Sequence, residues 1–178
     1  MRIIRGFLKG KRFATPPNFP SRPTTDYAKE GFFNILENYF SIEDKAILDL
    51  CAGTGNISFE FVSRGAKSVL SIDSNPRCVQ SLKINSQNLG IETIMNSYKT
   101  DCIVYCRNGK EKFDFIYADP PFHLKFHEEL ITVIFQKALL KEDGYLVVEH
   151  GKQTNLTAID NFEFCRNFGN VYFSFFKA

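Results

Sequence analysis

The feature that most constrains the fold of this chain is a regular alternation of short apolar runs with helical segments, which begins at residue 46. The apolar runs occupy residues 46–50, 68–72, 91–95, 113–118 and 145–149. Helical patterns separate them, at residues 56–64, 76–89 and 126–140. Strands that are apolar on both faces and alternate with helices are typical of parallel sheets covered on both sides. The sequence therefore predicts a doubly wound α/β fold with a mostly parallel sheet.

The end of the chain has a different pattern. Two aromatic-rich runs, 162–166 and 171–175, flank the turn residues 167–170. Such a pair predicts an antiparallel hairpin, which we expect at the edge of the sheet. The length of 178 residues suits one domain with a short appendage.

Residues 1–25 contain six cations and no acid, whereas the rest of the chain is slightly acidic. The cations are Arg2, Arg5, Lys9, Lys11, Arg12 and Arg22. The mixture of apolar residues and glycines over 2–13 indicates a short hairpin, and four prolines between 16 and 23 predict an extended connector. A basic arm on a nearly neutral body suggests a polyanionic partner; a solvated arm that binds nothing is the alternative.

Several classes of protein are excluded by the sequence. No apolar run is long enough to cross a bilayer, and the basic N-terminus lacks the apolar core of a secretory signal. The five cysteines form no CxxC pair and the three histidines form no HExxH motif, so we expect reduced thiols and no metal site. These features predict a cytoplasmic protein.

A glycine turn follows the first predicted strand. Asp49 lies near the end of that strand, and Gly53 and Gly55 allow a sharp turn that brings backbone close to a ligand. Asp73 ends the second strand, 20 residues after Gly53. A carboxylate in this place is suited to accept hydrogen bonds from ribose hydroxyls. The turn therefore predicts a nucleoside-containing cofactor.

Two cofactors compete for this turn. The dinucleotide fingerprint of NAD needs a third glycine, but Ser58 stands in its place. The acid Asp49 suits the cationic ammonium group of S-adenosylmethionine, which NAD lacks. Asp101 follows the third predicted strand and suits either the adenine amino group or a helix N-cap. The predicted cofactor-binding residues are Asp49, Cys51, Ala52, Gly53, Thr54, Gly55, Asp73, Ser74 and Asp101.

The fourth strand ends in Asp119-Pro120-Pro121-Phe122, which is the most specific motif in the chain. The carboxyl ends of strands are where open α/β sheets bind ligands. The Asp119 carboxylate and the Pro120 carbonyl are suited to hold the two hydrogens of an exocyclic amine, which favours attack by its lone pair. Phe122 offers a surface on which a flipped base can stack. The catalytic residues predicted are Asp119, Pro120 and Phe122; a stiff strand exit with no catalytic role is the alternative.

The chain resembles the RsmD family of bacterial rRNA methyltransferases over nearly its whole length. The matching segments are Met1–Gly6, Lys9–Arg12, Arg22–Asp26, Lys29–Glu30, Phe33–Leu36, Leu48–Gly55 and Asp119–Phe122. Many methyltransferases share the glycine turn, and many amino methyltransferases share the Asp-Pro-Pro-Phe turn. The N-terminal arm and the Arg22–Asp26 segment are therefore what point to this family.

The resemblance implies S-adenosylmethionine as the sole cofactor, and a class I methyltransferase fold with a seven-stranded sheet and an antiparallel C-terminal hairpin. It implies methylation of N2 of a guanine in 16S rRNA of the small ribosomal subunit. Residues 1–25 would be a basic arm and linker that contacts phosphates, and residues 26–178 the methyltransferase domain. The implied substrate-binding residues are Arg2, Arg5, Lys9, Lys11, Arg12, Arg22, Thr24, Thr25 and Pro121.

Three other functions stay open from the residues alone. An adenine-N6 methyltransferase acting on RNA or DNA uses the same turn, because adenine N6 is also a ring-attached amine. A ribosome-assembly factor that binds RNA without catalysis is a second alternative, and an NAD oxidoreductase is a third. No dimer interface is indicated, so we expect a monomer.

Overall fold

The computed structural model describes residues 1–15, 24–120 and 124–178, with the backbone alone for 124 and 125. The extended connector predicted between the prolines lies outside these residues. So do three residues assigned to the site from the sequence, namely Arg22, Pro121 and Phe122.

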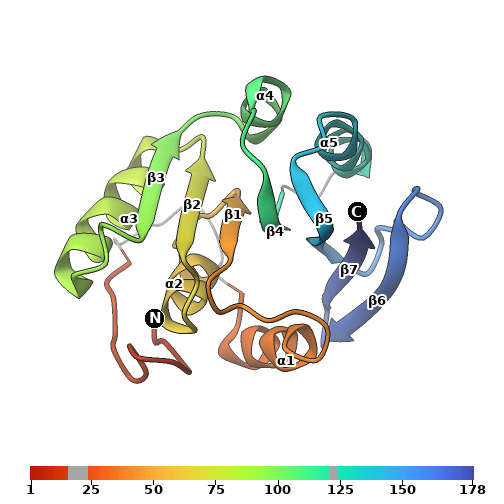
Figure 1. Ribbon diagram of the computed structural model, residues 1–178. Coiled ribbons are helices and arrows are strands. Elements are labelled where there is room, and N and C mark those ends of the chain that lie inside the picture. The colour runs from red at the N-terminus through yellow and green to blue at the C-terminus, as the bar shows by residue number, and fades with distance from the viewer. Residues whose placement is uncertain (16–23, 121–123) are drawn as a thin grey trace.

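A seven-stranded sheet runs through the middle of the molecule, in the order β3-β2-β1-β4-β5-β7-β6 (Figure 1). The strands are β1 (Ala46–Leu50), β2 (Ser68–Asp73), β3 (Met95–Lys99), β4 (Phe113–Ala118), β5 (Leu140–Gly151), β6 (Phe162–Phe168) and β7 (Val171–Lys177). The first five strands pair in parallel, while β7 is antiparallel to both β5 and β6. The predicted mostly parallel sheet with an antiparallel C-terminal hairpin is confirmed.

Helices cover both faces of this sheet (Figure 1). They are α1 (Asp26–Leu36), α2 (Asn56–Ser63), α3 (Pro76–Leu89), α4 (Cys102–Asn108) and α5 (Leu124–Gln136). One core contains side chains of α1, α2 and α3, and the core on the opposite face contains side chains of α4 and α5. Within the described parts of the chain, no helix is long and apolar enough to span a membrane.

Helix α1 forms where local sequence and packing agree. The Thr25 hydroxyl accepts a hydrogen bond from the Ala28 amide at 3.2 Å, so Thr25 caps the helix. Ala28, Phe32 and Leu36 recur at helical spacing and are fully buried. Phe32 stacks on Phe173 of β7, with the ring centroids 5.0 Å apart. Phe32 also contacts Phe115 and Tyr117 of β4, so the helix packs on the sheet through an aromatic side chain.

The third strand lies further along the chain than the sequence predicted. Residues 91–95 were expected to form it, but Ile91 begins a turn that ends at Met95, and the strand is Met95–Lys99. Ile91 is apolar because it is buried in the core, not because it lies in the sheet. The strand has the polar sequence MNSYK because it is an edge strand with little buried surface.

The boundary between α5 and β5 also differs from the prediction. The helix was expected over 126–140 and the strand over 145–149, but Ala138 has a positive φ of 49° and the helix ends at Gln136. Leu139 and Leu140 are buried beside the sheet, and β5 begins at Leu140. Their apolar side chains continue the helical pattern in the sequence, which explains the error. The short helix α4 was not predicted as an element.

The N-terminal segment forms a small hairpin that packs on the α1/α2 face. Arg2 and Arg12 form an antiparallel bridge, and Ile3, Leu8 and Phe13 are buried in the same core as α1 and α2. The segment is anchored through its backbone. The Phe7 amide donates to the Ser63 carbonyl at 2.9 Å, and the Leu8 amide donates to the Ser63 hydroxyl at 3.0 Å.

Two glycines of this hairpin allow a matched test of its docking. Gly6 and Gly10 have φ values of 81° and 84°, but a Cβ on Gly6 would lie 1.6 Å from the Ser63 carbonyl oxygen, whereas a Cβ on Gly10 meets nothing within 4 Å. We expect Gly10→Ala to lower the free energy of unfolding by roughly 1–2 kcal/mol through its backbone conformation alone. Gly6→Ala should cost about 1–3 kcal/mol more, because the hairpin must move away from α2.

Urea unfolding of both variants measures this difference. Equal losses in the two variants would contradict the docking of the hairpin on Ser63.

Candidate active site

The predicted site residues gather where the strand order reverses. Strands β1 and β4 are neighbours, and the chain winds away from them in opposite directions. Ligands of open α/β sheets bind outside the carboxyl ends of the strands at such a point. The glycine turn follows β1, Asp73 ends β2 and Asp119 follows β4. The Asp119 amide donates to the Leu50 carbonyl at 3.2 Å, so the two predicted turns are in direct contact.

The turn after β1 has an unusual backbone. Cys51, Gly53 and Gly55 all have positive φ values, of 60°, 53° and 78°. Gly55 is also the N-cap of α2, and a Cβ there would lie 2.4 Å from Leu82 and 2.7 Å from Phe59. Glycine at 55 therefore allows the first turn of α2 to pack closely on α3 while the loop bends toward the strand ends.

Asp73 holds this turn in place. One of its carboxylate oxygens accepts from the Gly53 amide at 2.8 Å, and the other accepts from the Asn75 amide at 2.7 Å. Its side chain is half-buried at the end of β2. The carboxylate thus fixes the glycine turn of β1 against the turn of β2. It keeps lone pairs that are suited to ribose hydroxyls, because each carboxylate oxygen can accept more than one hydrogen bond.

Asp49 lies beneath the turn and not on its surface. It is 1% exposed, and it accepts a hydrogen bond from the Ser58 hydroxyl, which lies 2.8 Å from the Ser71 hydroxyl. The pKa of Asp49 is raised to about 7, mainly by burial; the hydrogen bond from Ser58 lowers the pKa and the charge of Asp73 raises it. The sequence did not give Ser58 a role. Because its carboxylate is covered, we expect Asp49 to influence a cation above the turn through its electric field and not by direct contact.

Asp101 is an N-cap, as one of its two interpretations predicted. Its carboxylate accepts a hydrogen bond from the Val104 amide at 2.9 Å and caps the N-terminus of α4.

Thr54 is buried, and its hydroxyl lies 3.5 Å from the sulfur of Met1. The N-terminus of the chain therefore contacts the glycine turn. Of the remaining predicted residues, Ser74 is exposed and Ala52 is half-buried.

Asp119 occupies the centre of the site. It is half-buried and Pro120 is buried. The pKa of Asp119 is raised well above its usual range, first by burial and then by the charges of Glu149 and Asp49. A carboxyl with a raised pKa at the end of a central strand is a typical candidate for proton transfer or for holding a reacting group.

A second polar cluster, which the sequence did not reveal, lies beside Asp119. Glu149, near the end of β5, is 5% exposed. Its Oε2 accepts hydrogen bonds from the Tyr117 hydroxyl and, at 2.9 Å, from the Thr24 hydroxyl. Thr24 was expected to contact substrate, and the structure brings it to this edge of the sheet. The one sequence signal for Glu149 was a carboxylate at the end of an apolar strand, as at Asp49.

The five described cations of the N-terminal segment are all exposed. Arg5 pairs with Glu37 at 2.9 Å, and Arg2 pairs weakly with Asp26 at 3.5 Å. Over the described ranges of the chain, no acid lies within ion-pair distance of the other three, which are Lys9, Lys11 and Arg12. These three are therefore available to an external anion.

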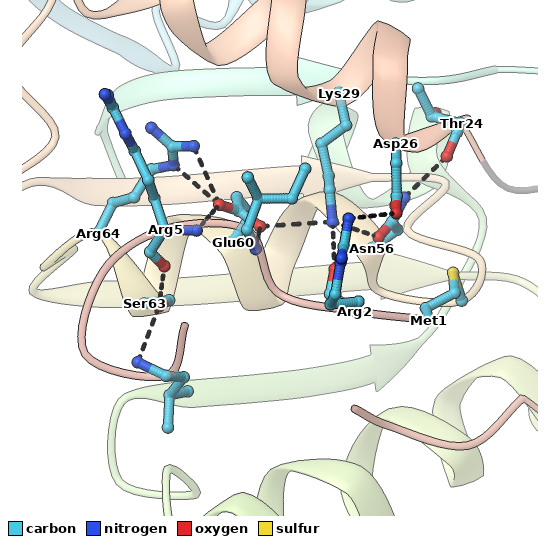
Figure 2. A network of polar contacts seen from close by, with 12 residues as sticks. Met1, Arg2, Arg5, Thr24, Asp26, Lys29, Asn56, Glu60, Ser63 and Arg64 are labelled. Atoms are coloured by element: carbon cyan, nitrogen blue, oxygen red, sulfur yellow. Dashed lines mark hydrogen bonds and ion pairs between the residues drawn. The ribbon is translucent and has the colours of Figure 1, made fainter. Parts of the chain in front are cut away.

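A buried network joins this segment to the site (Figure 2). Lys29 is fully buried, and its ammonium group donates to the Arg2 carbonyl and to the Asn56 side chain, each at 2.8 Å. It also lies 3.3 Å from Glu60, and burial lowers the pKa of Lys29. Asn56, directly after the glycine turn, donates to the Thr24 carbonyl at 2.8 Å. The N-terminal segment, the glycine turn and Thr24 thus share one set of hydrogen bonds.

The charges of the site fit a cationic cofactor. Asp49, Asp73, Asp119 and Glu149 gather at one edge of the sheet, and no Lys, Arg or His of the described residues forms an ion pair with any of them. Such a field favours a sulfonium and an ammonium group and disfavours the phosphates of a dinucleotide. S-adenosylmethionine carries both cations and a ribose, for which Asp73 is suited.

The sheet order and this acidic glycine turn define a class I, S-adenosylmethionine-dependent methyltransferase. The chain belongs to the family described as conserved hypothetical protein 95, which is the RsmD family; its model matches residues 1–177.

Three comparisons illustrate the relationship. "Ribosomal RNA small subunit methyltransferase D" of Haemophilus influenzae is 32% identical over 165 residues, covering 90% of this chain and 84% of that protein. The solved structure titled "Putative methyltransferase yhhF" from Escherichia coli has a TM-score of 0.87 at 26% identity and covers 99% of this chain and 97% of its own. The Thermus thermophilus 16S rRNA N2 G1207 methyltransferase RsmC, solved with AdoMet and guanosine, shares the fold with a TM-score of 0.78 at 18% identity, over 97% of this chain and 48% of its own.

We expect Asp73→Ala to weaken S-adenosylmethionine binding roughly ten- to a hundredfold, as measured by titration calorimetry. The change removes the carboxylate that orders the glycine turn, and hydrogen bonds to a charged group contribute about 1.5–3 kcal/mol each. Asp101→Ser is the matched control, because serine keeps the N-cap but removes the carboxylate. Unchanged affinity in Asp73→Ala would contradict the placement of the ribose, and a loss in Asp101→Ser would show that Asp101 also contacts the cofactor.

Proposed function

We propose that this protein transfers a methyl group from S-adenosylmethionine to the exocyclic N2 of a guanine in 16S rRNA. The observation that carries the proposal is the contact between the two turns: the Asp119 amide is bonded to the Leu50 carbonyl, where the glycine turn begins. A group held by Asp119 is therefore next to a cofactor held by the glycine turn. Family membership and the name of the relative from Haemophilus influenzae support RNA of the small subunit as the substrate.

Each part of the site has a defined task in this proposal. The bound cofactor supplies an electrophilic methyl group. The Asp119 carboxylate and the Pro120 carbonyl accept the two hydrogens of the amine, which directs its lone pair at the methyl carbon. Asp119 also stabilises the positive charge that develops on nitrogen. Holding both reactants in this geometry contributes on the order of 7–11 kcal/mol to lowering the barrier.

Phe122 and Pro121, which lie outside the described residues, complete the site in this proposal. Phe122 stacks on the base, and Pro121 contacts the substrate, as the sequence predicts. Asp49 and Asp73 hold the cofactor, and Asp101 stays a candidate beside its capping role.

The N-terminal segment is proposed to contact the RNA backbone. Lys9, Lys11 and Arg12 are exposed and have no acidic partner over the described ranges, so they are suited to phosphates. Phosphate contacts position an enzyme without reading sequence. Arg22 and Thr25 are proposed to contact RNA close to the base. We further propose that the protein acts as a cytoplasmic monomer on the small ribosomal subunit.

The product identifies the reaction. Small subunits from a strain lacking the enzyme are incubated with the protein and radiolabelled S-adenosylmethionine, and the RNA is digested to nucleosides. We expect N2-methylguanosine as the labelled product. N6-methyladenosine as the product would be consistent with the mechanism proposed for Asp119 but would show that the substrate base is adenine and not guanine. Absence of label in a protein that binds the cofactor would contradict the substrate class.

Asp119→Ala is expected to abolish methylation, with a loss of at least a hundredfold in rate, and to leave RNA binding largely intact. The substitution removes a group that acts on the amine in the transition state, and positioned acid–base groups contribute about 10²–10⁴-fold. Single-turnover rates measure the first effect, and filter binding of the same RNA measures the second. Wild-type activity in this variant would exclude the proposed mechanism.

A further inference from the structure

Glu149 is a buried carboxylate that the mechanism above does not use. Its Oε2 accepts from the Thr24 hydroxyl at 2.9 Å and from the Tyr117 hydroxyl, and it forms no ion pair with a cation in the described parts of the chain. Burying a carboxylate without a cation is unfavourable. A glutamine would accept the same two hydrogen bonds with a smaller loss of solvation. Packing alone therefore does not account for an acid at this position.

The sheet register brings Glu149 beside Asp119. Ala118 of β4 pairs with Val148 of β5, so Asp119 and Glu149 are the next residues of two paired strands. The Asp119 amide bonds to the Leu50 carbonyl and continues the β4/β1 ladder past the end of the strand. Because side chains alternate across a strand, Asp119 lies on the same face as Tyr117, two residues earlier. The hydroxyl of Tyr117 reaches Glu149, so all three share one face.

The ionisable groups around Asp119 are nearly all acidic. Glu149 faces it from β5 and Asp49 from β1, and both charges raise the pKa of Asp119 beyond the effect of burial. Cys51 faces it from the glycine turn, and the charge of Asp119 is one of the causes that raise the pKa of this thiol. On β4 itself, the pKa of Tyr117 is raised well above its usual range by burial and by the charges of Glu149 and Asp119. Before α1, the segment contributes the neutral hydroxyl of Thr24.

We propose that Glu149 is a positioning residue for methyl transfer, which holds Thr24 and Tyr117 beside the base pocket and makes Asp119 a stronger proton acceptor. The inference rests on the proposed function, because it takes Asp119 as the group that holds the amine. As the nitrogen bonds to the methyl carbon, the bond from that carbon to sulfur breaks and its electron pair stays on sulfur. The proton that leaves the nitrogen passes to the Asp119 carboxylate and from there to water.

The negative charge of Glu149 has a defined effect on the pH dependence. Only ionised Asp119 accepts a hydrogen from the amine, so the methylation rate rises with pH as Asp119 loses its own proton. Because Asp119 and Glu149 influence each other's ionisation, the two carboxyls titrate as a pair. Glu149→Gln keeps an acceptor for Thr24 and Tyr117 but removes the neighbouring charge. Asp119 then ionises at lower pH, and the acidic limb of the rate profile moves to lower pH by about one unit or more.

The test compares single-turnover methylation rates of the wild type, Glu149→Gln and Glu129→Gln between about pH 5 and 9, with cofactor and RNA saturating. Glu129 is the matched control, because it is an exposed glutamate paired with Arg107 at 2.6 Å. We expect the acidic limb of the rate profile to move to lower pH in Glu149→Gln and to stay unchanged in Glu129→Gln. A purely structural role for Glu149 would lower the rate at every pH without moving the limb, and that result would overturn the inference.

Two further results keep the test decisive. If the wild-type protein methylates no RNA at any pH, the proposed function is wrong. If the Glu149→Gln variant is active and the acidic limb of its rate profile has not moved, only the inference about Glu149 is wrong. If that variant does not fold, wild-type protein labelled with carboxyl-¹³C aspartate is titrated by NMR, with the Asp119 signal assigned through Asp119→Asn. We expect a midpoint well above the ordinary value of about 4. A midpoint at that ordinary value would overturn the inference.

Discussion

The parallel pairing of β1 with β4 is the constraint on which the rest of this structure depends. Because the chain winds away from this pair in both directions, the carboxyl ends of the two strands lie at the point where open α/β sheets bind ligands. The turn after β1 and the turn after β4 are thereby held together, with a hydrogen bond from the Asp119 amide to the Leu50 carbonyl. The site is a consequence of this strand order, since its residues come from segments that are far apart in the chain.

The proposed chemistry of the site follows from a concentration of carboxylates that, among the described residues, form no ion pair with a cation. Burial and mutual repulsion raise the pKa of Asp49 to about 7 and that of Asp119 well above its usual range. Such an arrangement is unfavourable for folding, because buried charges lose their hydration. In the proposed mechanism, the same field stabilises a cationic cofactor and a nitrogen that becomes positive in the transition state. We therefore expect a cationic cofactor to relieve part of this electrostatic repulsion when it binds.

The N-terminal segment belongs to the core as well as to the proposed RNA surface. Glu60 of α2 accepts hydrogen bonds from the Ile4 and Arg5 amides, each at 2.9 Å, and pairs with Lys29 of α1 (Figure 2). Lys29 in turn binds Asn56 beside the glycine turn. Buried, directional bonds therefore connect the segment that carries the cations proposed to contact RNA with the loop proposed to hold the cofactor. These bonds fix the segment relative to the site.

The sequence by itself determined the parts of this protein that depend on local patterns. Buried strands such as β1 and β4, the bounds of α3 between Pro76 and Gly90, and the sharp glycine turn after β1 were all predicted correctly. The tertiary structure decided β3, whose polar sequence reflects its edge position, and the surroundings of Glu149, whose hydrogen-bond partner Thr24 is 125 residues away. The reason is physical: periodicity and turn chemistry act between neighbours in the chain, whereas burial and pKa depend on which strands the sheet places side by side.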